Sequence, residues 1–151
     1  MIIEIKNSSV KFLSKQSHTY GENLFANATP AASAGNIFDF SGAVDGAAIY
    51  GNGAVGVSDA SSLSAIIPVS AGDVFVYSGT ATSGFPINIA GYNSTARTVS
   101  GGKVADILRA ATAPQENVEI TITQEMVNSG VVAIRAWGLT SSNPSIKKQL
   151  D

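Results

Sequence analysis

Several short segments of this chain alternate apolar and polar side chains with a period of two residues. The clearest example is Val118–Thr123 (VEITIT), and more apolar segments of similar length are Val74–Ser78, Pro86–Tyr92 and Val131–Trp137 (VVAIRAW). Successive side chains of a β-strand point to opposite faces, so this alternation predicts strands. Gly, Asn, Ser and Pro separate the segments at intervals of about ten residues, which is typical of a sandwich or barrel.

The composition agrees with one compact β domain. The chain has 151 residues, 44% of them hydrophobic and 13% charged, with no cysteine. This length is sufficient for one core, and the low charge argues against disorder. The polar residues are mostly Ser, Thr, Asn and Gly, which favour turns over long helices. We therefore expect an all-β fold, an antiparallel β-sandwich of the jelly-roll kind with at most one short helix.

The chain divides into three expected regions. Residues 1–18 form an N-terminal arm or two short strands, at Ile2–Ile5 and Val10–Leu13. Residues 19–140 form the sandwich. Residues 141–151 form a tail that frays or packs outside the core.

One segment predicts a helix, and two features predict turns. Over Lys103–Ala111 the apolar residues recur at i, i+3, i+4 and i+7, which marks one face of a helix. Ser70–Asp73 is an expected turn between two strands. Pro68 cannot donate a backbone hydrogen bond, so we expect it at a strand end or on an edge strand.

Each expected strand has one plain aliphatic face and one mixed face. The aliphatic face is assigned to the core between the sheets, and its members are Val74, Val76, Ile87, Ile89, Ile120, Ile122, Val132, Ile134 and Ala136. The mixed face carries Phe75 and the five predicted ligand-binding residues, namely Tyr77, Asn88, Tyr92, Arg135 and Trp137. Rings beside hydrogen-bonding groups suit a sugar, and they equally suit a protein interface.

Two of these residues also have simpler interpretations. A single tryptophan in a small β domain is more often a core or subunit-contact residue, which is the interpretation we favour for Trp137. Arg135 more often pairs with a carboxylate than binds a ligand. Tyr92 lies beside turn residues and is therefore expected to be exposed.

The sequence offers no recognisable catalytic constellation. His18 is the only histidine and lies in a polar stretch, and no serine has the surroundings of a nucleophile elbow. The acids Asp39, Asp45, Asp59, Asp73 and Asp106 stand singly and are expected to be turn residues, and all except Asp39 lie beside Gly, Ser or Ala. The string from Gly51 to Gly56 fits GxGxxG but lacks a βαβ context. We expect no catalytic residue, no metal site and no cofactor.

Charge and hydropathy limit the partners. The net charge is −2 and the few Lys and Arg are scattered, so we expect no nucleic-acid binding. No apolar run is long enough to cross a bilayer, so we expect no membrane insertion. The start, MIIEIK, lacks the features of a signal peptide, which predicts a protein made in the cytoplasm.

The order of several short motifs resembles a known family. These motifs are Asn23–Phe25 (NLF), Ser64–Val69 (SAIIPV), Ala71–Asp73 (AGD), Val76–Gly79 (VYSG), Ile89–Asn93 (IAGYN) and the late strand Val131–Trp137. Together they look like the β-sandwich modules of bacteriophage tail fibres, tailspikes and baseplate proteins, which resemble carbohydrate-binding jelly rolls. The likeness spans roughly residues 23–138 and rests on motif order and composition.

The resemblance implies a non-catalytic virion module, made in the host cytoplasm, that binds a host-surface carbohydrate or receptor. Its partners would be that glycan or receptor, other virion proteins and further copies of the chain, with a homotrimer favoured. An alternative is a structural homo-oligomeric virion component of a tail, fibre or capsid decoration, whose aromatic face is a subunit interface. The short arm with Lys6, Lys11 and Lys15 departs from the family pattern and favours this structural role.

Overall fold

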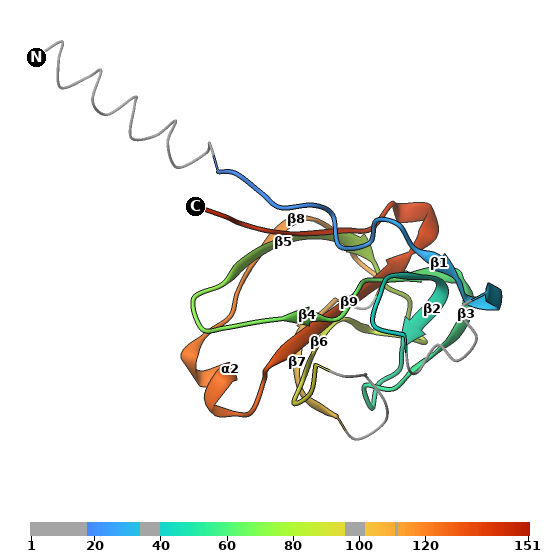
Figure 1. Cartoon of the computed structure of the whole chain (residues 1–151). Coiled ribbons are helices and arrows are strands. Elements are labelled where there is room, and N and C mark those ends of the chain that lie inside the picture. The colour runs from blue at the N-terminus through green and yellow to red at the C-terminus, as the bar shows by residue number, and fades with distance from the viewer. Residues whose placement is uncertain (1–17, 34–39, 96–101, 111) are drawn as a thin grey trace, which may run out of the picture.

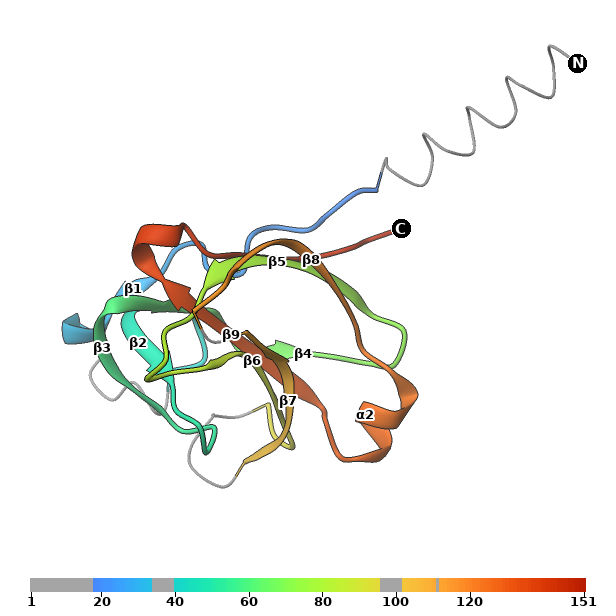
Figure 2. The same ribbon diagram turned by 180° about the vertical axis from the view of Figure 1, so that it is seen from behind.

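The chain forms a β-sandwich of unequal layers (Figures 1 and 2), in which all named strand pairs are antiparallel except the short parallel pair at the edge of the larger layer. This computed structural model describes residues 18–33, 40–95, 102–110 and 112–151. The expected strands at Ile2–Ile5 and Val10–Leu13 lie outside these residues. Within them, the elements are β1 (Thr29–Pro30), η1 (Ala31–Ser33), β2 (Val44–Ile49), β3 (Val55–Leu63), β4 (Ile67–Pro68), β5 (Val74–Thr80), β6 (Ile87–Tyr92), β7 (Lys103–Arg109), β8 (Pro114–Thr121), α2 (Gln124–Asn128), β9 (Ala133–Leu139), η3 (Thr140–Ser142) and β10 (Ser145–Lys148).

The described strands divide into a large and a small sheet. The large sheet has the order β1-β2-β3-β9-β6-β7, and β4 pairs with β9 beside this path. The small sheet has the order β10-β5-β8, and it forms the upper layer in Figure 1. A jelly roll has eight strands in two Greek keys, so this division into seven and three confirms the sandwich but not the jelly roll.

Two hydrophobic clusters cover both faces of the central strands. The inter-sheet cluster lies between the two sheets and includes Phe75 and Tyr77 of β5 against Ile89 and Ile134 of the large sheet. The hairpin cluster lies where the large sheet curls, because β2 contacts both β6 and β9. It contains Val44, Ile49, Val55, Leu63, Ile87, Tyr92 and Trp137. Strands β6 and β9 are therefore buried on both faces.

Glycine and aspartate build the tight connections as their chemistry predicts. The turn before β5 is closed by Ser70 N donating to Asp73 Oδ2 at 2.9 Å, and Gly72 adopts a φ of +93°. The Gly51–Gly53 segment is the β2–β3 hairpin turn, in which Gly53 has a φ of +89°. The turn at Ser70–Asp73 and the strand end at Pro68 are thus confirmed.

The predicted helix over Lys103–Ala111 is wrong, because residues 103–109 form strand β7. This strand pairs antiparallel with β6, and the register shifts between Ile87 and Ile89. The shift lets the adjacent residues Ile107 and Leu108 both pack against the inter-sheet cluster. A strand with a bulge thus has the same i, i+3, i+4 spacing of apolar residues as a helix. Pairing with β6 stabilises the strand in place of the helix.

The expectation of a loose tail over residues 141–151 is also wrong. Strand β10 pairs with β5, with Ile146 opposite Tyr77, and Ile146 is completely buried. Ser145 and Lys147 alternate with Ile146 and point away from the core, whereas Lys148 pairs with Asp73 beside the turn before β5. The sandwich therefore extends to the end of the described chain.

The assignment of faces in β5 is reversed. Phe75 and Tyr77 are completely buried in the inter-sheet cluster, whereas Val74 and Val76 are only partly buried. Both sets are apolar, so the alternation alone did not say which set faces the core. The larger rings gain more from burial, and the Tyr77 hydroxyl finds a partner there. In β8 the assignment is confirmed, because Ile120 and Ile122 are buried and Glu119 and Thr121 are exposed.

Candidate functional site

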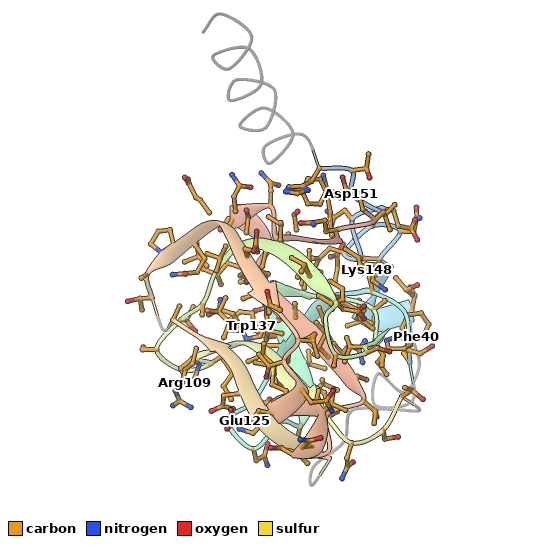
Figure 3. The ribbon with its side chains drawn as sticks, turned by 90° about the vertical axis from the view of Figure 1, so that its left-hand side faces the viewer. Phe40, Arg109, Glu125, Trp137, Lys148 and Asp151 are labelled. Carbon is orange, nitrogen blue, oxygen red and sulfur yellow. The ribbon has the colours of Figure 1, made fainter. Side chains whose placement is uncertain are left out.

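The five predicted ligand-binding residues do not form a surface. Tyr77, Asn88, Tyr92, Arg135 and Trp137 are all 0% exposed. Trp137 lies inside the molecule, whereas Lys148 and Asp151 lie at its periphery (Figure 3). The predicted exposed aromatic face is therefore wrong, since Tyr77 and Asn88 lie between the two sheets and the hairpin cluster contains Tyr92 and Trp137.

Tyr77 and Asn88 instead belong to a buried hydrogen-bond network that joins the sheets. The Tyr77 hydroxyl donates to the Trp137 carbonyl at 2.6 Å and accepts from Asn88 Nδ2 at 3.1 Å. Asn88 Oδ1 in turn accepts from the backbone N–H of Ala110 at 3.1 Å. Burial raises the pKa of Tyr77 to about 12, and the Asn88 hydrogen bond acts in the opposite direction. This network holds the neutral phenol in place, which is a structural role.

Arg135 and Tyr92 also serve the backbone of neighbouring segments. Arg135 donates from Nε to the Ser64 carbonyl at 2.7 Å and from Nη2 to the Gly42 carbonyl at 2.8 Å. Burial lowers the pKa of its guanidinium to about 10, and Tyr92 raises it by a smaller amount. The Tyr92 hydroxyl donates to the Gly53 carbonyl at 2.7 Å and so fixes the β2–β3 turn.

Trp137 is the core residue that its simpler interpretation predicted. Its ring meets the Phe85 ring edge-on, with centroids 5.8 Å apart. Within the described part of the chain, its indole N–H has no hydrogen-bond partner. A completely buried ring in this position contributes to packing and offers no platform to a ligand in solvent.

The small sheet presents the most promising surface, on the side that faces away from the core. Lys147 of β10, Val76 of β5 and Glu119 of β8 are register partners, so their side chains form a row across the three strands. We call this surface the outer face and define it by Tyr20, Val76, Ser78, Thr80, Gln115, Glu116, Asn117, Glu119, Ser142, Ser145 and Lys147.

Tyr20 brings an aromatic ring to the outer face. The segment before β1 runs beside β10, with a bridge between Tyr20 and Gln149 and a hydrogen bond of 2.8 Å from Gly21 N to the Lys148 carbonyl. This pairing extends the small sheet past β10 and puts Tyr20 next to the row of outer-face side chains. Tyr20 is 42% exposed, and its ring meets the His18 ring edge-on at a centroid distance of 6.5 Å.

His18 anchors the start of this segment to the end of the chain. Its Nδ1 lies 3.3 Å from Asp151 Oδ1, and Thr19 N donates to Asp151 Oδ2 at 3.2 Å. Both partners are partly exposed. His18 thus has a hydrogen-bond partner in Asp151, and no serine or threonine hydroxyl of the described residues hydrogen-bonds to its ring.

Two hollows open on the outer face and share Asn117. The first, of about 290 Å³, is lined by Tyr20, Val76, Asn117, Glu119, Ser145 and Lys147. The second, of about 520 Å³, is lined by Ser78, Gly79, Thr80, Pro114, Gln115, Glu116, Asn117 and Ser142. We call them the ring hollow and the amide hollow. The larger volume lies within the range of roughly 300–1,000 Å³ that small-molecule sites occupy.

The backbone at Asn117 explains why the hollows meet there. The pairing of β5 with β8 is irregular between Tyr77 and Gly79, and Asn117 adopts a left-handed φ of +49°. Asparagine tolerates this conformation better than most residues. Its N–H donates to Ser78 Oγ at 2.9 Å, which locks the irregularity. The bulge therefore opens the sheet surface at the junction of the hollows.

The charges of the outer face are few and mixed. Glu116 lines the amide hollow, while Glu119 and Lys147 line the ring hollow on either side of Val76. None of the three forms an ion pair with a described residue. Such a surface offers carboxylate acceptors and ammonium donors without a strong net charge.

The five acids proposed as turn residues have different partners. Asp73 closes the turn before β5, as expected. Asp45 of β2 accepts from the hydroxyl of Ser62 in β3 at 2.8 Å. Asp106 pairs with Lys103 and Arg109, and all three lie in β7. Asp59 lies exposed in β3, and Asp39 lies outside the described residues. Among the described residues, no three His, Asp or Glu side chains are grouped as metal ligands.

Sequence reasoning missed most of the outer face. Glu119 was correctly placed on the exposed side of its strand, but Tyr20 was assigned to no strand, and Lys147 was assigned to a tail. The usable signal was the alternation in β10, where Ile146 is buried between the partly exposed Ser145 and the exposed Lys147. No local pattern could reveal that Tyr20 pairs with Gln149, because that contact spans the chain.

Comparison with known proteins does not add to this description. No family model matches the sequence, and neither a curated protein nor a solved structure is similar to it. No helix in the described ranges has the length and apolar character needed to span a membrane. The functional argument therefore depends on the side chains of the outer face.

Proposed function

We propose that this chain is a non-catalytic carbohydrate-binding module and that the outer face of the small sheet is its binding surface. The observation that carries this proposal is the exposed Tyr20 ring in one hollow with Asn117, Glu119 and Lys147. The sequence resemblance further suggests that the module belongs to a bacteriophage virion, where it would attach the particle to a host-surface glycan.

The chemistry of sugars fits this set of side chains. The apolar face of a pyranose stacks on an exposed aromatic ring, and Tyr20 offers such a ring. Sugar hydroxyls both donate and accept, so they pair with a carboxylate, an amide and an ammonium group. The five residues predicted from the sequence to bind a ligand have the same kinds of side chain, but all five are buried and contact other parts of the sandwich.

The alternative, a homo-oligomeric structural component, has lost its main support. Its interface was the aromatic face, which is buried within one chain. The two sheet edges formed by β7 and β8 carry features that oppose edge pairing, namely charged side chains in both strands and a proline and a bulge in β8. The homotrimer is a prediction from the sequence resemblance alone. Light scattering that gives a monomer at high concentration would contradict it.

The binding proposal is tested by comparing two exposed tyrosines on a glycan array of bacterial surface polysaccharides. Tyr20 is 42% exposed and Tyr50, on the β2–β3 hairpin, is 39% exposed. We expect the full chain to bind at least one glycan, Tyr20→Ala to lose that binding, and Tyr50→Ala to keep it. The proposal fails if no glycan binds or if the two substitutions have the same effect.

A further inference from the structure

We propose that the outer face binds an uncharged oligosaccharide over at least two consecutive sugar units, one in the ring hollow and one in the amide hollow. This inference rests on the proposed function and adds the length and charge of the ligand. It also assigns Asn117 as the residue that contacts both units, because Asn117 lines both hollows.

The first argument is the length of the surface. The two hollows follow one another along β8, with Glu119 in the ring hollow, Gln115 in the amide hollow and Asn117 in both. Gln115 is opposite Gly79, beyond the bulge, so it does not lie in one row with Glu119. Four residues of regular strand cover roughly 13 Å, and the bulge makes the distance between these two residues shorter than that. A single sugar ring does not extend over that distance, whereas a short chain of sugars does.

The second argument is the unused hydrogen-bonding capacity at the junction. The Asn117 N–H is bound to Ser78 Oγ at 2.9 Å, and its Oδ1 has only a long contact of 3.5 Å with the same hydroxyl. No described residue accepts from its Nδ2 group. An asparagine amide with free donors between two hollows is suited to bridge hydroxyls of neighbouring sugars.

The third argument is the balance of charge. The two hollows contain Glu116 and Glu119 against the single ammonium of Lys147. A chain of uronates, sulfated sugars or phosphodiesters would bring its negative charges beside these carboxylates, which is unfavourable. Neutral hydroxyls instead donate to the carboxylates, so the surface favours an uncharged glycan.

The polar lining also argues against a protein as the occupant. The core of a protein interface is enriched in aromatic and other apolar side chains and depleted of Glu and Lys. Val76 and Tyr20 are the large apolar side chains of the ring hollow, and Pro114 is the one apolar side chain among the described residues that line the amide hollow. A glycan needs only one such ring for stacking.

The test is calorimetric titration of the full chain with ladders of defined sugars. The ladders run from monosaccharide to hexasaccharide of glucose, mannose and N-acetylglucosamine, with galacturonic acid as the charged series. We expect at least one neutral series in which the trisaccharide binds about tenfold or more tighter than the monosaccharide, and weaker binding of the uronates.

One glutamine substitution tests the position of the second sugar, and another serves as its control. Gln115→Ala removes a side chain of the amide hollow, and we expect it to abolish the gain in affinity with length while leaving monosaccharide binding unchanged. Gln124→Ala is the matched control, because Gln124 is exposed on α2 and lines neither hollow. It should leave both affinities unchanged.

The outcomes separate the two proposals. Equal affinity for all lengths, or a length gain that survives Gln115→Ala, overturns the second sugar position while the binding module stands. Tighter binding of the uronates overturns the uncharged ligand. Failure of every series to bind overturns this inference together with the proposed function.

Discussion

The Tyr77 hydroxyl donates a hydrogen bond of 2.6 Å to the Trp137 carbonyl, and this bond connects the small sheet to the centre of the large one. The same hydroxyl accepts from Asn88, so one phenol oxygen serves both β9 and β6. All three side chains are completely buried. The contact fixes the separation of the two sheets at this point and leaves the outer side of the small sheet free.

Removing this hydroxyl should destabilise the fold. Tyr77→Phe removes the donor to the Trp137 carbonyl and the acceptor of Asn88 Nδ2, and an unsatisfied buried group costs about 1–3 kcal/mol. Urea unfolding should show that loss in the free energy of unfolding. Tyr20→Phe is the control, since its exposed hydroxyl has no described partner, and it should change stability by less than about 0.5 kcal/mol. Equal effects of both substitutions would contradict the assigned role.

The stability advantage of Tyr77 over phenylalanine should shrink in alkali. Burial raises the folded pKa of Tyr77 to about 12, from an ordinary value of 10.0. Between these values the unfolded chain releases the proton and the folded chain keeps it, so stability falls as pH rises. The difference in the free energy of unfolding between wild type and Tyr77→Phe should decrease by on the order of 2–3 kcal/mol between these two pH values. Urea unfolding of both proteins from pH 8 upward would measure it, and a constant difference would contradict the burial of the phenol.

Close packing around the same hydroxyl makes Gly79 intolerant of a side chain. A Cβ atom at Gly79 would lie 2.4 Å from the Tyr77 hydroxyl oxygen. We expect Gly79→Ala to lower the free energy of unfolding by roughly 1–3 kcal/mol, as overpacking does. A Cβ at Gly51 would meet nothing within 4 Å, so Gly51→Ala serves as the control. A neutral Gly79→Ala would show that the phenol is not confined in this way.

The end of the chain should contribute to stability as a core strand does. Ile146 is completely buried, whereas Leu150 is 64% exposed. Ile146→Ala should cost roughly 2–5 kcal/mol, the usual range for truncating a buried isoleucine. Leu150→Ala should have almost no effect. If thermal or urea unfolding shows no loss of stability for Ile146→Ala, the end of the chain does not pack as a core strand, and the predicted loose tail is correct.

The class of fold could be predicted because each strand carries its own local signal. Period-two patterns and turn residues marked β5, β6, β8 and β9 without knowledge of their neighbours. The helix predicted over residues 103–111 failed because pairing of β7 with β6 outweighed a weak local preference. Local pattern and tertiary pairing were in conflict there, and pairing prevailed.

The site could not be predicted because it depends on which face of each strand is covered. Asn88 and Arg135 looked suited to a ligand, but Asn88 is buried against Tyr77 of the small sheet, and Arg135 is buried against the carbonyls of Ser64 and Gly42. Conversely, Tyr20 became an outer-face residue through a pairing with Gln149 more than a hundred residues away. The alternation of residues along one strand does not show whether both faces of that strand are buried, or which distant segment lies beside it.

The most direct test of this account is to map a bound glycan on the isotope-labelled chain by amide NMR. A neutral oligosaccharide should shift the signals of Tyr20, Asn117, Glu119 and Lys147, while the β2–β3 hairpin around Asn52 stays unchanged. Shifts confined to that hairpin, or to the side of the molecule near α2, would place binding elsewhere and contradict the outer face as the binding surface.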